Sequence, residues 1–243
     1  MGDSSGGVRV LAVLAACLLG GARARFASAG ETDRPLLLPP EVSSVSRERA
    51  LAAGPRLRLV WIDVLDTAPY AFQNAARETS AILADAGVQA SWTLGDASTV
   101  TSGEELKIVL LAGAANGARL PEHVMGGTHR GGQSHATWVY LSNVLWALGL
   151  EDHGARRLSV QEEEQVARAL GRVVAHEIVH AVAPDLPHTA HGLMAGKLGR
   201  ADLLQGSAAL APAEQRAFRA ALPGFTLAMA SAPVPLTASA AGR

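Results

Sequence analysis

Apolar residues recur in short runs through the middle of the chain, and these runs predict a series of strands. Runs rich in Val, Ile and Leu that are bounded by Gly, Pro or polar residues are typical of β-strands. The sequence predicts strands over residues 57–65, 88–94, 106–111 and 136–141, with a short edge strand near 123–125. The run at 106–111 is apolar for most of its length, which predicts a central position in the sheet.

A second pattern, with apolar residues spaced at three and four, predicts helices between and after these strands. It covers residues 71–86 and 211–222, and residues 142–148 fit a helical turn. The longest example begins at Ser159-Val160-Gln161-Glu162, which is a capping box: a serine at the N-cap and a glutamate three residues later. Proline cannot continue a helix, so Pro184 predicts that this long helix ends near Ala183.

The order of these elements predicts an α+β fold, in which helices cover a mixed, mostly parallel sheet with an edge strand. One domain over residues 56–228 holds all of them, including the long helix and a C-terminal helix. Residues 30–55 are rich in proline and serine and are interpreted as a linker or short pro-segment. Residues 229–243 are expected to be a disordered tail.

The N-terminus has the pattern of an export signal. Arg9 precedes an apolar run over residues 10–19, which is too short to span a membrane, and the Ala-Ser-Ala at 27–29 fits a cleavage site. Residues 1–29 are therefore predicted to be a signal peptide. An alternative remains, because Leu14-Ala15-Ala16-Cys17 resembles a bacterial lipobox, which would make Cys17 a lipid anchor.

The composition limits which partners and which cellular compartment we expect. Of 243 residues, 49% are hydrophobic and 18% charged, with a net charge of -1 and no Lys/Arg-rich block, so nucleic acid is not an expected partner. Cys17 is the only cysteine, and an exported chain without disulfides suits a bacterial periplasm or the medium. Contact with a membrane is expected only if Cys17 is lipidated.

The long helix carries the motif His176-Glu177-Ile178-Val179-His180 (H-E-x-x-H). Residues i and i+4 share one helix face, so two imidazoles can point at one metal ion. Zinc accepts imidazole nitrogens and keeps a coordination position for water in catalytic sites. Glu177 lies beside the pair, where it can take a proton from water as a general base. Two ordinary surface histidines are the alternative, which the apolar residues around the motif disfavour.

Catalytic zinc usually keeps three protein ligands, and the sequence offers three candidates for the third. Asp185, His188 and His191 all follow the predicted end of the helix and precede Met194. His188 is favoured because it has eight residues after His180 in which to return, and Pro187 restricts the backbone just before it. Asp185 and His191 remain open.

Residues 176–194, HEIVHAVAPDLPHTAHGLM, resemble the metzincin-type zinc metallopeptidases, and in particular exported bacterial proteases with the pattern H-E-x-G-H-L-L-L-G-x-x-x-H-S-x-x-G-I-M. The matching positions are His176, Glu177, His180, His188, Gly192 and Met194, with Leu193 in place of isoleucine. The resemblance implies a zincin-like catalytic domain. It also implies that His188 is the third ligand and that Met194 forms a "Met-turn" beneath the metal.

The chain departs from this family in three respects. The gap between His180 and His188 is two residues longer than in the standard motif H-E-x-x-H-x-x-G-x-x-H, and Pro184 stands where the exported group has glycine. No tyrosine follows Met194, so a tyrosine ligand after the Met-turn is absent.

These features predict a zinc-dependent peptidase that acts on a peptide or protein substrate, with Glu177 as the general base. A catalytically silent zinc-binding module and a zinc-dependent hydrolase of a non-peptide amide or ester are the alternatives. The intact Glu177 favours an enzyme, since structural zinc is usually held by four ligands rich in cysteine. His123, His129 and His135, in a glycine-rich stretch, are interpreted mainly as ordinary loop histidines, with a role in a substrate cleft or second metal site as the alternative.

Overall fold

The computed structural model describes most of the predicted domain. It covers residues 54–64, 66, 68–96, 99, 105–113, 120–128, 136–150, 157–206 and 208–231, with side chains to residue 226. The predicted signal peptide, Cys17, nearly all of the linker at 30–55, His129, His135 and residues 232–243 lie outside the described residues. Within the described residues, none of the helices combines the length and apolar character needed to cross a membrane.

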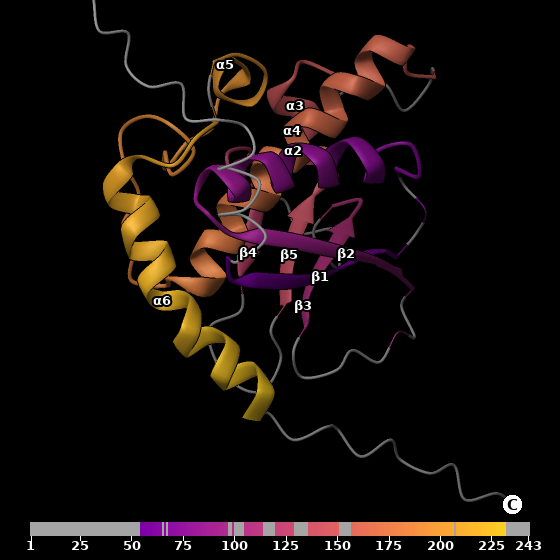
Figure 1. Cartoon of the computed structure of the whole chain (residues 1–243). Helices are drawn as coiled ribbons and strands as arrows, with labels where there is room; N and C mark the ends of the chain where they lie inside the picture. Colours follow the sequence, from indigo (N-terminus) through magenta and orange to yellow (C-terminus); the bar gives the residue numbers. More distant parts are fainter. Residues whose placement is uncertain are drawn as a thin grey trace, which may run out of the picture. The chain divides into compact units, whose positions relative to one another are not determined.

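Five strands form one mixed sheet in the order β2-β1-β3-β5-β4 (Figure 1). Their bounds are β1 Arg56–Asp63, β2 Gln89–Gly95, β3 Glu105–Leu111, β4 Gly126–Thr128 and β5 Ala136–Tyr140. Neighbouring strands are parallel except for β4, which pairs with β5 in the antiparallel sense. The mostly parallel sheet and the central place of β3 are thus confirmed.

The edge strand begins at Gly126, three residues after the position that the sequence predicts. The Val124 N–H donates to the Pro121 carbonyl at 2.8 Å, and the Asn143 side chain donates to the carbonyls of both residues. These bonds hold residues 121–124 as a turn, so their backbone groups are not available for strand pairing. Pairing begins with the hydrogen bond from the Tyr140 N–H to the Met125 carbonyl, at 2.8 Å.

The described helices are α2 Phe72–Asp85, α3 Leu141–Ala147, α4 Val160–Val182, α5 Arg200–Leu204 and α6 Pro212–Ser231. The short α5 was not predicted. The predicted end of the last helix at residue 222 is wrong, because α6 continues past Pro223 and includes 229–231, which the sequence assigns to the tail. The Thr226 hydroxyl lies within hydrogen-bond distance of the Leu222 and Pro223 carbonyls, 3.1 and 3.0 Å away, and so bridges the turn around this proline.

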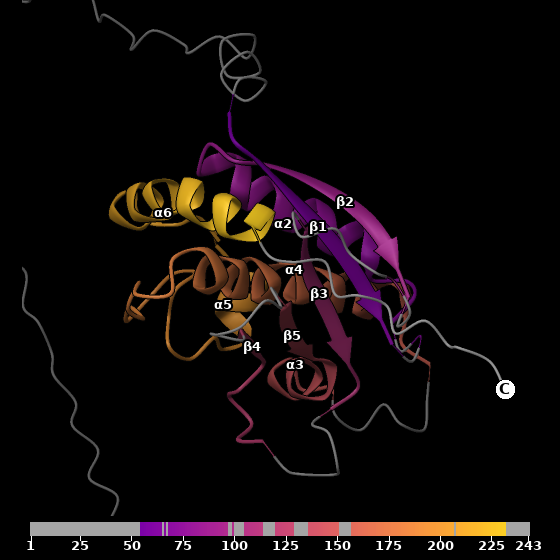
Figure 2. The ribbon, with the colours of Figure 1, turned by 90° about the horizontal axis from the view of Figure 1, so that it is seen from below.

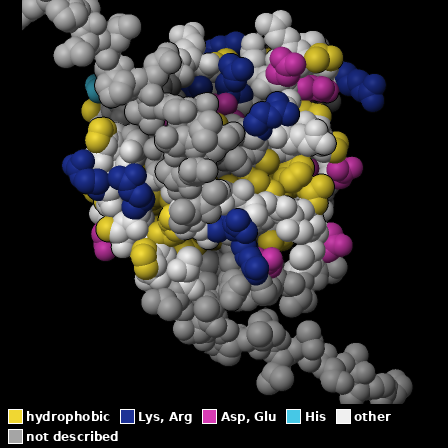
Figure 3. Space-filling model, viewed as in Figure 1, with side chains coloured by type: hydrophobic (Ala, Val, Ile, Leu, Met, Phe, Trp, Pro, Cys, Tyr) yellow, Lys and Arg dark blue, Asp and Glu magenta, His cyan; other side chains and the backbone are white. Residues whose placement is uncertain are grey.

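Helices α2 and α4 lie side by side against one face of the sheet (Figures 1 and 2). The strands point alternate residues at these helices. On β3 these are Leu106, Ile108 and Leu110, which are buried. The opposite face of β3, with Lys107, Val109 and Leu111, is only partly buried. Figure 3 shows charged side chains of both signs scattered over the visible face, with apolar side chains between them.

Helix α4 is the most deeply buried element, because α3, α5 and α6 also pack against it. Every residue from 169 to 180 is buried, so the helix has no solvent-facing stripe over these three turns. Gly171 allows α2 to approach closely, since a Cβ at this position would lie 2.7 Å from the Ala75 carbonyl oxygen. Polar side chains on this part of α4 therefore need partners inside the protein.

Candidate metal centre

The ends of α4 fix where its polar residues lie. At the start, the capping box is confirmed: Glu162 N–H donates to Ser159 Oγ at 3.3 Å, and Glu162 Oε2 accepts from Ser159 N–H at 2.8 Å. At the other end, Ala183 N–H donates to the Val179 carbonyl, and Pro184 follows outside the helix. The H-E-x-x-H motif thus occupies the last turns of a continuous helix.

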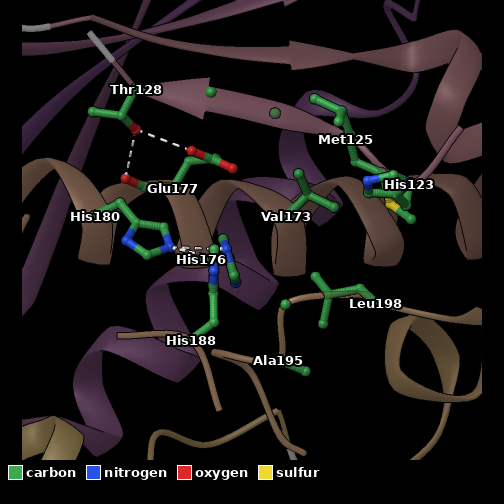
Figure 4. Close-up of a pocket in the computed structure, with 14 residues that line it drawn as sticks. His123, Met125, Thr128, Val173, His176, Glu177, His180, His188, Ala195 and Leu198 are labelled. Carbon is green, nitrogen blue, oxygen red and sulfur yellow. Dashed lines mark hydrogen bonds between the residues drawn. The ribbon is translucent and has the colours of Figure 1, made fainter. Parts of the chain in front are cut away.

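Three imidazoles meet beside this end of α4 (Figure 4). His180 Nε2 lies 3.1 Å from His176 Nε2 and 2.9 Å from His188 Nε2, and the three potential ligand atoms all lie within 4.8 Å of one another. His176 and His180 are buried, whereas His188 is exposed. We call these three residues the histidine cluster.

The donor set of the histidine cluster fits zinc. Ligand nitrogens at zinc–nitrogen distances of about 2.0–2.1 Å in tetrahedral geometry are about 3.3–3.4 Å apart, close to the two separations that His180 Nε2 makes here. His176 Nδ1 lies 2.7 Å from the Leu193 carbonyl, to which it can only donate, so Nε2 of this ring carries the lone pair. A donated ring N–H of this kind is typical of metal-bound histidines.

The environment of His176 also favours the neutral ring that metal binding requires. Burial lowers the pKa of His176 below its ordinary value of 6.5, and the nearby His188 acts in the same direction. The hydrogen bond to the Leu193 carbonyl opposes this shift. Since the pKa is lowered overall, His176 is mostly neutral at neutral pH.

The loop after α4 returns His188 to the helix. Thr189 N–H donates to the Met194 carbonyl at 2.8 Å, and Gly196 N–H donates to the Thr189 carbonyl at 3.3 Å. Gly192 lies between them with a φ of 84°, a left-handed conformation that glycine adopts without strain. These bonds close the loop over residues 189–196, and the Leu193 carbonyl within it contacts His176 on α4, so that His188 lies beside the two helix histidines.

The other two candidates for a third ligand are placed differently. Asp185 and His191 are both exposed, and neither belongs to the group of potential ligands that the described residues form around His176 and His180. Met194 is fully buried in the core, directly after Leu193, whose carbonyl holds His176. A role of Met194 beneath a metal stays a prediction from the resemblance.

Glu177 points to a different neighbour, strand β4. Its Oε2 accepts a hydrogen bond of 3.0 Å from the Thr128 hydroxyl, and it is buried with 8% exposed. Its carboxylate does not belong to the group of possible metal ligands. The sequence did not identify Thr128, because a three-residue strand with two glycines has no alternating pattern to reveal it.

A cleft of about 390 Å³ opens beside the histidine cluster and Glu177 (Figure 4). Its polar wall consists of His123, Thr128, His176, Glu177, His180 and His188. The rest is mostly apolar or glycine: Val124, Met125, Gly126, Gly127, Val173, Ala195, Gly196 and Leu198. His123 is thus exposed at the cleft, the less favoured of its two predicted environments.

Comparisons with known proteins do not assign this chain to a family. No protein family's sequence model matches the chain, and no curated protein matches it. Among solved structures it is similar to archaemetzincin from Methanopyrus kandleri, with a TM-score of 0.48 and 12% sequence identity over 70% of this chain and 98% of that one. A likeness at this level does not assign a family, so the chemistry of the site rests on its own residues.

Proposed function

We propose that this protein is a zinc-dependent peptidase. The observation that carries the proposal is that three imidazole nitrogens converge at one edge of an open cleft while the carboxylate of Glu177 lines the same cleft. His176, His180 and His188 would hold the ion. Zinc, when bound, is a Lewis acid that polarises a carbonyl and lowers the pKa of water to about 7.

We propose that Glu177 transfers the proton during the reaction. It directly follows the proposed ligand His176 in the sequence, but its side chain turns toward β4. Glu177 is therefore not placed to bind the ion and instead lines the cleft. There its carboxylate accepts a proton from the attacking water and then gives it to the leaving amine. Burial of Glu177 excludes bulk water from most of its surface, which strengthens its interaction with a developing charge.

The proposed substrate is a peptide in extended conformation. Strand β4 lies at the edge of the sheet and lines the cleft with all three of its residues, Gly126, Gly127 and Thr128. A peptide can add to such an edge through its backbone hydrogen bonds. The apolar residues Met125, Val173 and Leu198 give the same cleft a surface for apolar side chains.

The test combines metal analysis with digestion of denatured casein, with and without a chelator. We expect one zinc per chain and cleavage that the chelator abolishes. Glu177→Ala and the closer match Glu177→Gln should retain zinc but lose about 10²–10⁴ in rate, the usual contribution of a general base. Loss of the metal from both variants would contradict the assignment of Glu177 as base.

Other outcomes of the same experiment identify the alternatives. Stoichiometric zinc without cleavage of casein or of a peptide library would indicate a binding module. Chelator-sensitive hydrolysis of ester or non-peptide amide substrates alone would indicate a different hydrolase.

We further propose that the protein acts outside the cytoplasm, on the basis of the signal pattern in residues 1–29. N-terminal sequencing of secreted material is expected to begin at Gly30 or somewhat later. A chain that begins at a lipid-modified Cys17 would instead establish the anchored form.

A further inference from the structure

Both oxygens of the Glu177 carboxylate lie against strand β4. The Oε2 atom is 3.0 Å from Thr128 Oγ1. A Cβ on Gly126 would lie 2.7 Å from Oε1 and 2.7 Å from Cγ, so any larger residue here would require the Glu177 side chain to move. Residues two apart on a strand face the same side, which explains why Gly126 and Thr128 act together on one carboxylate.

The Thr128 hydroxyl has one proton to donate and lies within hydrogen-bond distance of three oxygens. Two of these oxygens belong to Glu177: Oε2, and the backbone carbonyl oxygen at 3.1 Å (Figure 4). The third is Thr137 Oγ1, which lies 3.0 Å away. The carboxylate and the carbonyl can only accept, whereas a threonine hydroxyl can donate and accept. The consistent assignment is therefore that Thr137 donates to Thr128, and Thr128 donates to Glu177.

Thr137 is well placed to support this chain of bonds. It is fully buried on β5 and is the direct cross-strand partner of Thr128. A buried hydroxyl that donates to Thr128 fixes the direction of the Thr128 proton. Because Thr128 reaches both the carboxylate and the backbone carbonyl of Glu177, it restrains this side chain relative to its own helix.

We propose that Thr128 is a positioning residue for Glu177, supported by the hydroxyl of Thr137 and by the space at Gly126. This inference rests on the proposed function, in which Glu177 is the general base. A glutamate side chain has several rotatable bonds, and a base acts efficiently only when it is held in the productive geometry. The edge strand thus supplies a fixed support for the base as well as a wall of the cleft.

The first test compares Thr128→Val with Thr128→Ser in the zinc-loaded full chain. Valine keeps the shape of threonine but has no hydroxyl, so we expect kcat to fall about 10- to 100-fold, the usual effect of losing such a supporting partner. KM and zinc content should stay within about twofold, since the histidine cluster is untouched. Serine restores the hydroxyl and should recover most of kcat.

A buried threonine on α2, Thr79, provides the matched control. The Thr79 hydroxyl, like that of Thr128, donates to a backbone carbonyl of α4, here that of Gly171 at 2.9 Å, and it does not contact Glu177. Thr79→Val should lower the unfolding midpoint without lowering kcat. An equal loss of kcat in Thr79→Val and Thr128→Val would show a general effect of packing and would overturn the proposal.

A double-mutant cycle tests whether Thr128 acts through Glu177. In the Glu177→Ala background, Thr128→Val should cause no further loss of rate, because the group that it positions is gone. A full additional loss would overturn the proposal. Should Thr128→Val fail to fold, Gly126→Ala replaces it, since its Cβ displaces the carboxylate and is expected to lower kcat in the same way.

A crystal structure of zinc-loaded Thr128→Val gives a result that does not depend on activity. We expect the Glu177 carboxylate in a new rotamer or in two conformers. A Glu177 side chain that stays in a single, unchanged conformer overturns the proposal, whatever the activity of the variant. If wild-type protein hydrolyses no peptide, the proposed function fails, whereas the structure of the variant still decides whether Thr128 holds Glu177.

Discussion

Two buried polar regions lie one turn apart on α4, and they satisfy their hydrogen bonds in opposite ways. Arg172 directs its guanidinium at oxygens that belong to other elements. Its Nε lies 2.9 Å from Glu78 Oε1, and Nη1 donates to the carbonyls of Asp202 and Gln205 at 2.7 and 2.8 Å. The third nitrogen, Nη2, donates to the Gly206 carbonyl at 3.3 Å. The positive charge is thus surrounded by protein acceptors.

The histidine cluster, by contrast, turns its ring nitrogens toward one another. His180 Nε2 contacts the Nε2 atoms of both other rings, and the His176 Nε2 has no proton to offer, because Nδ1 donates to Leu193. Three imidazole nitrogens that converge in this way fit a cation in the donor set that zinc prefers. The polar residues of this one helix thus divide into one that bonds to protein acceptors, Arg172, and a cluster that the proposed zinc ion would bind.

The largest expected effect concerns Arg172 and the stability of the fold. Arg172→Met should lower the free energy of unfolding by about 3–5 kcal/mol, because it leaves Glu78 and three carbonyls without their donor. Urea denaturation of the metal-free protein measures the loss. The control is Arg168→Met on the same helix, where the side chain is exposed and a change within about 0.5 kcal/mol is expected. Equal losses would remove the distinction.

On the other side of the comparison, His188→Ala should weaken zinc binding by more than about 100-fold, beyond the effect of losing an outer-sphere partner. Because His188 is exposed, the stability of the metal-free chain should hardly change. Competition with a chromophoric chelator measures the affinity. Asp185→Ala and His191→Ala are the matched controls and should bind zinc nearly as wild type does. Tight one-to-one binding by His188→Ala would show that the third ligand is another residue.

The stability gained from zinc should depend on the histidine cluster and not on Arg172. At a free concentration of 100 times its Kd, zinc should stabilise the wild-type chain by about 2.7 kcal/mol, and a chelator should reverse this gain. Arg172→Met should gain as much as wild type, since its loss is independent of the ion. His188→Ala should gain little at the same zinc concentration. Thermal unfolding with and without zinc tests this, and an equal gain in all three proteins would point to binding elsewhere.

The smallest expected effect lies at the start of α4, where Ser159→Ala removes the capping box. The loss should be about 1 kcal/mol in unfolding free energy, the usual value for an N-cap. Zinc affinity should not change, because the histidine cluster lies at the other end of the helix. Ser159→Asp restores a capping oxygen and should recover most of the stability. A drop in zinc affinity in Ser159→Ala would show that the two ends are coupled.

The sequence alone determined those features whose pattern is local. Capping residues, a proline stop and apolar spacing predicted a helix from Ser159 to Ala183, and the structure has it from Val160 to Val182. Helix geometry then places His176 and His180 on one face, whatever the rest of the chain does. The four parallel strands were predicted for the same reason, since each is a short segment whose own residues are mainly apolar or alternate between apolar and polar.

Only the tertiary structure decided contacts that join distant parts of the chain. Local patterns left Asp185, His188 and His191 open, and only the packing of the closed 189–196 loop against His176 shows that His188 lies beside His180. Thr128 and Glu177 are 49 residues apart, and Arg172 and Glu78 are 94 apart. No spacing rule relates such pairs, because the paths of the intervening loops and the packing of α4 against β4 and α2 determine which side chains meet.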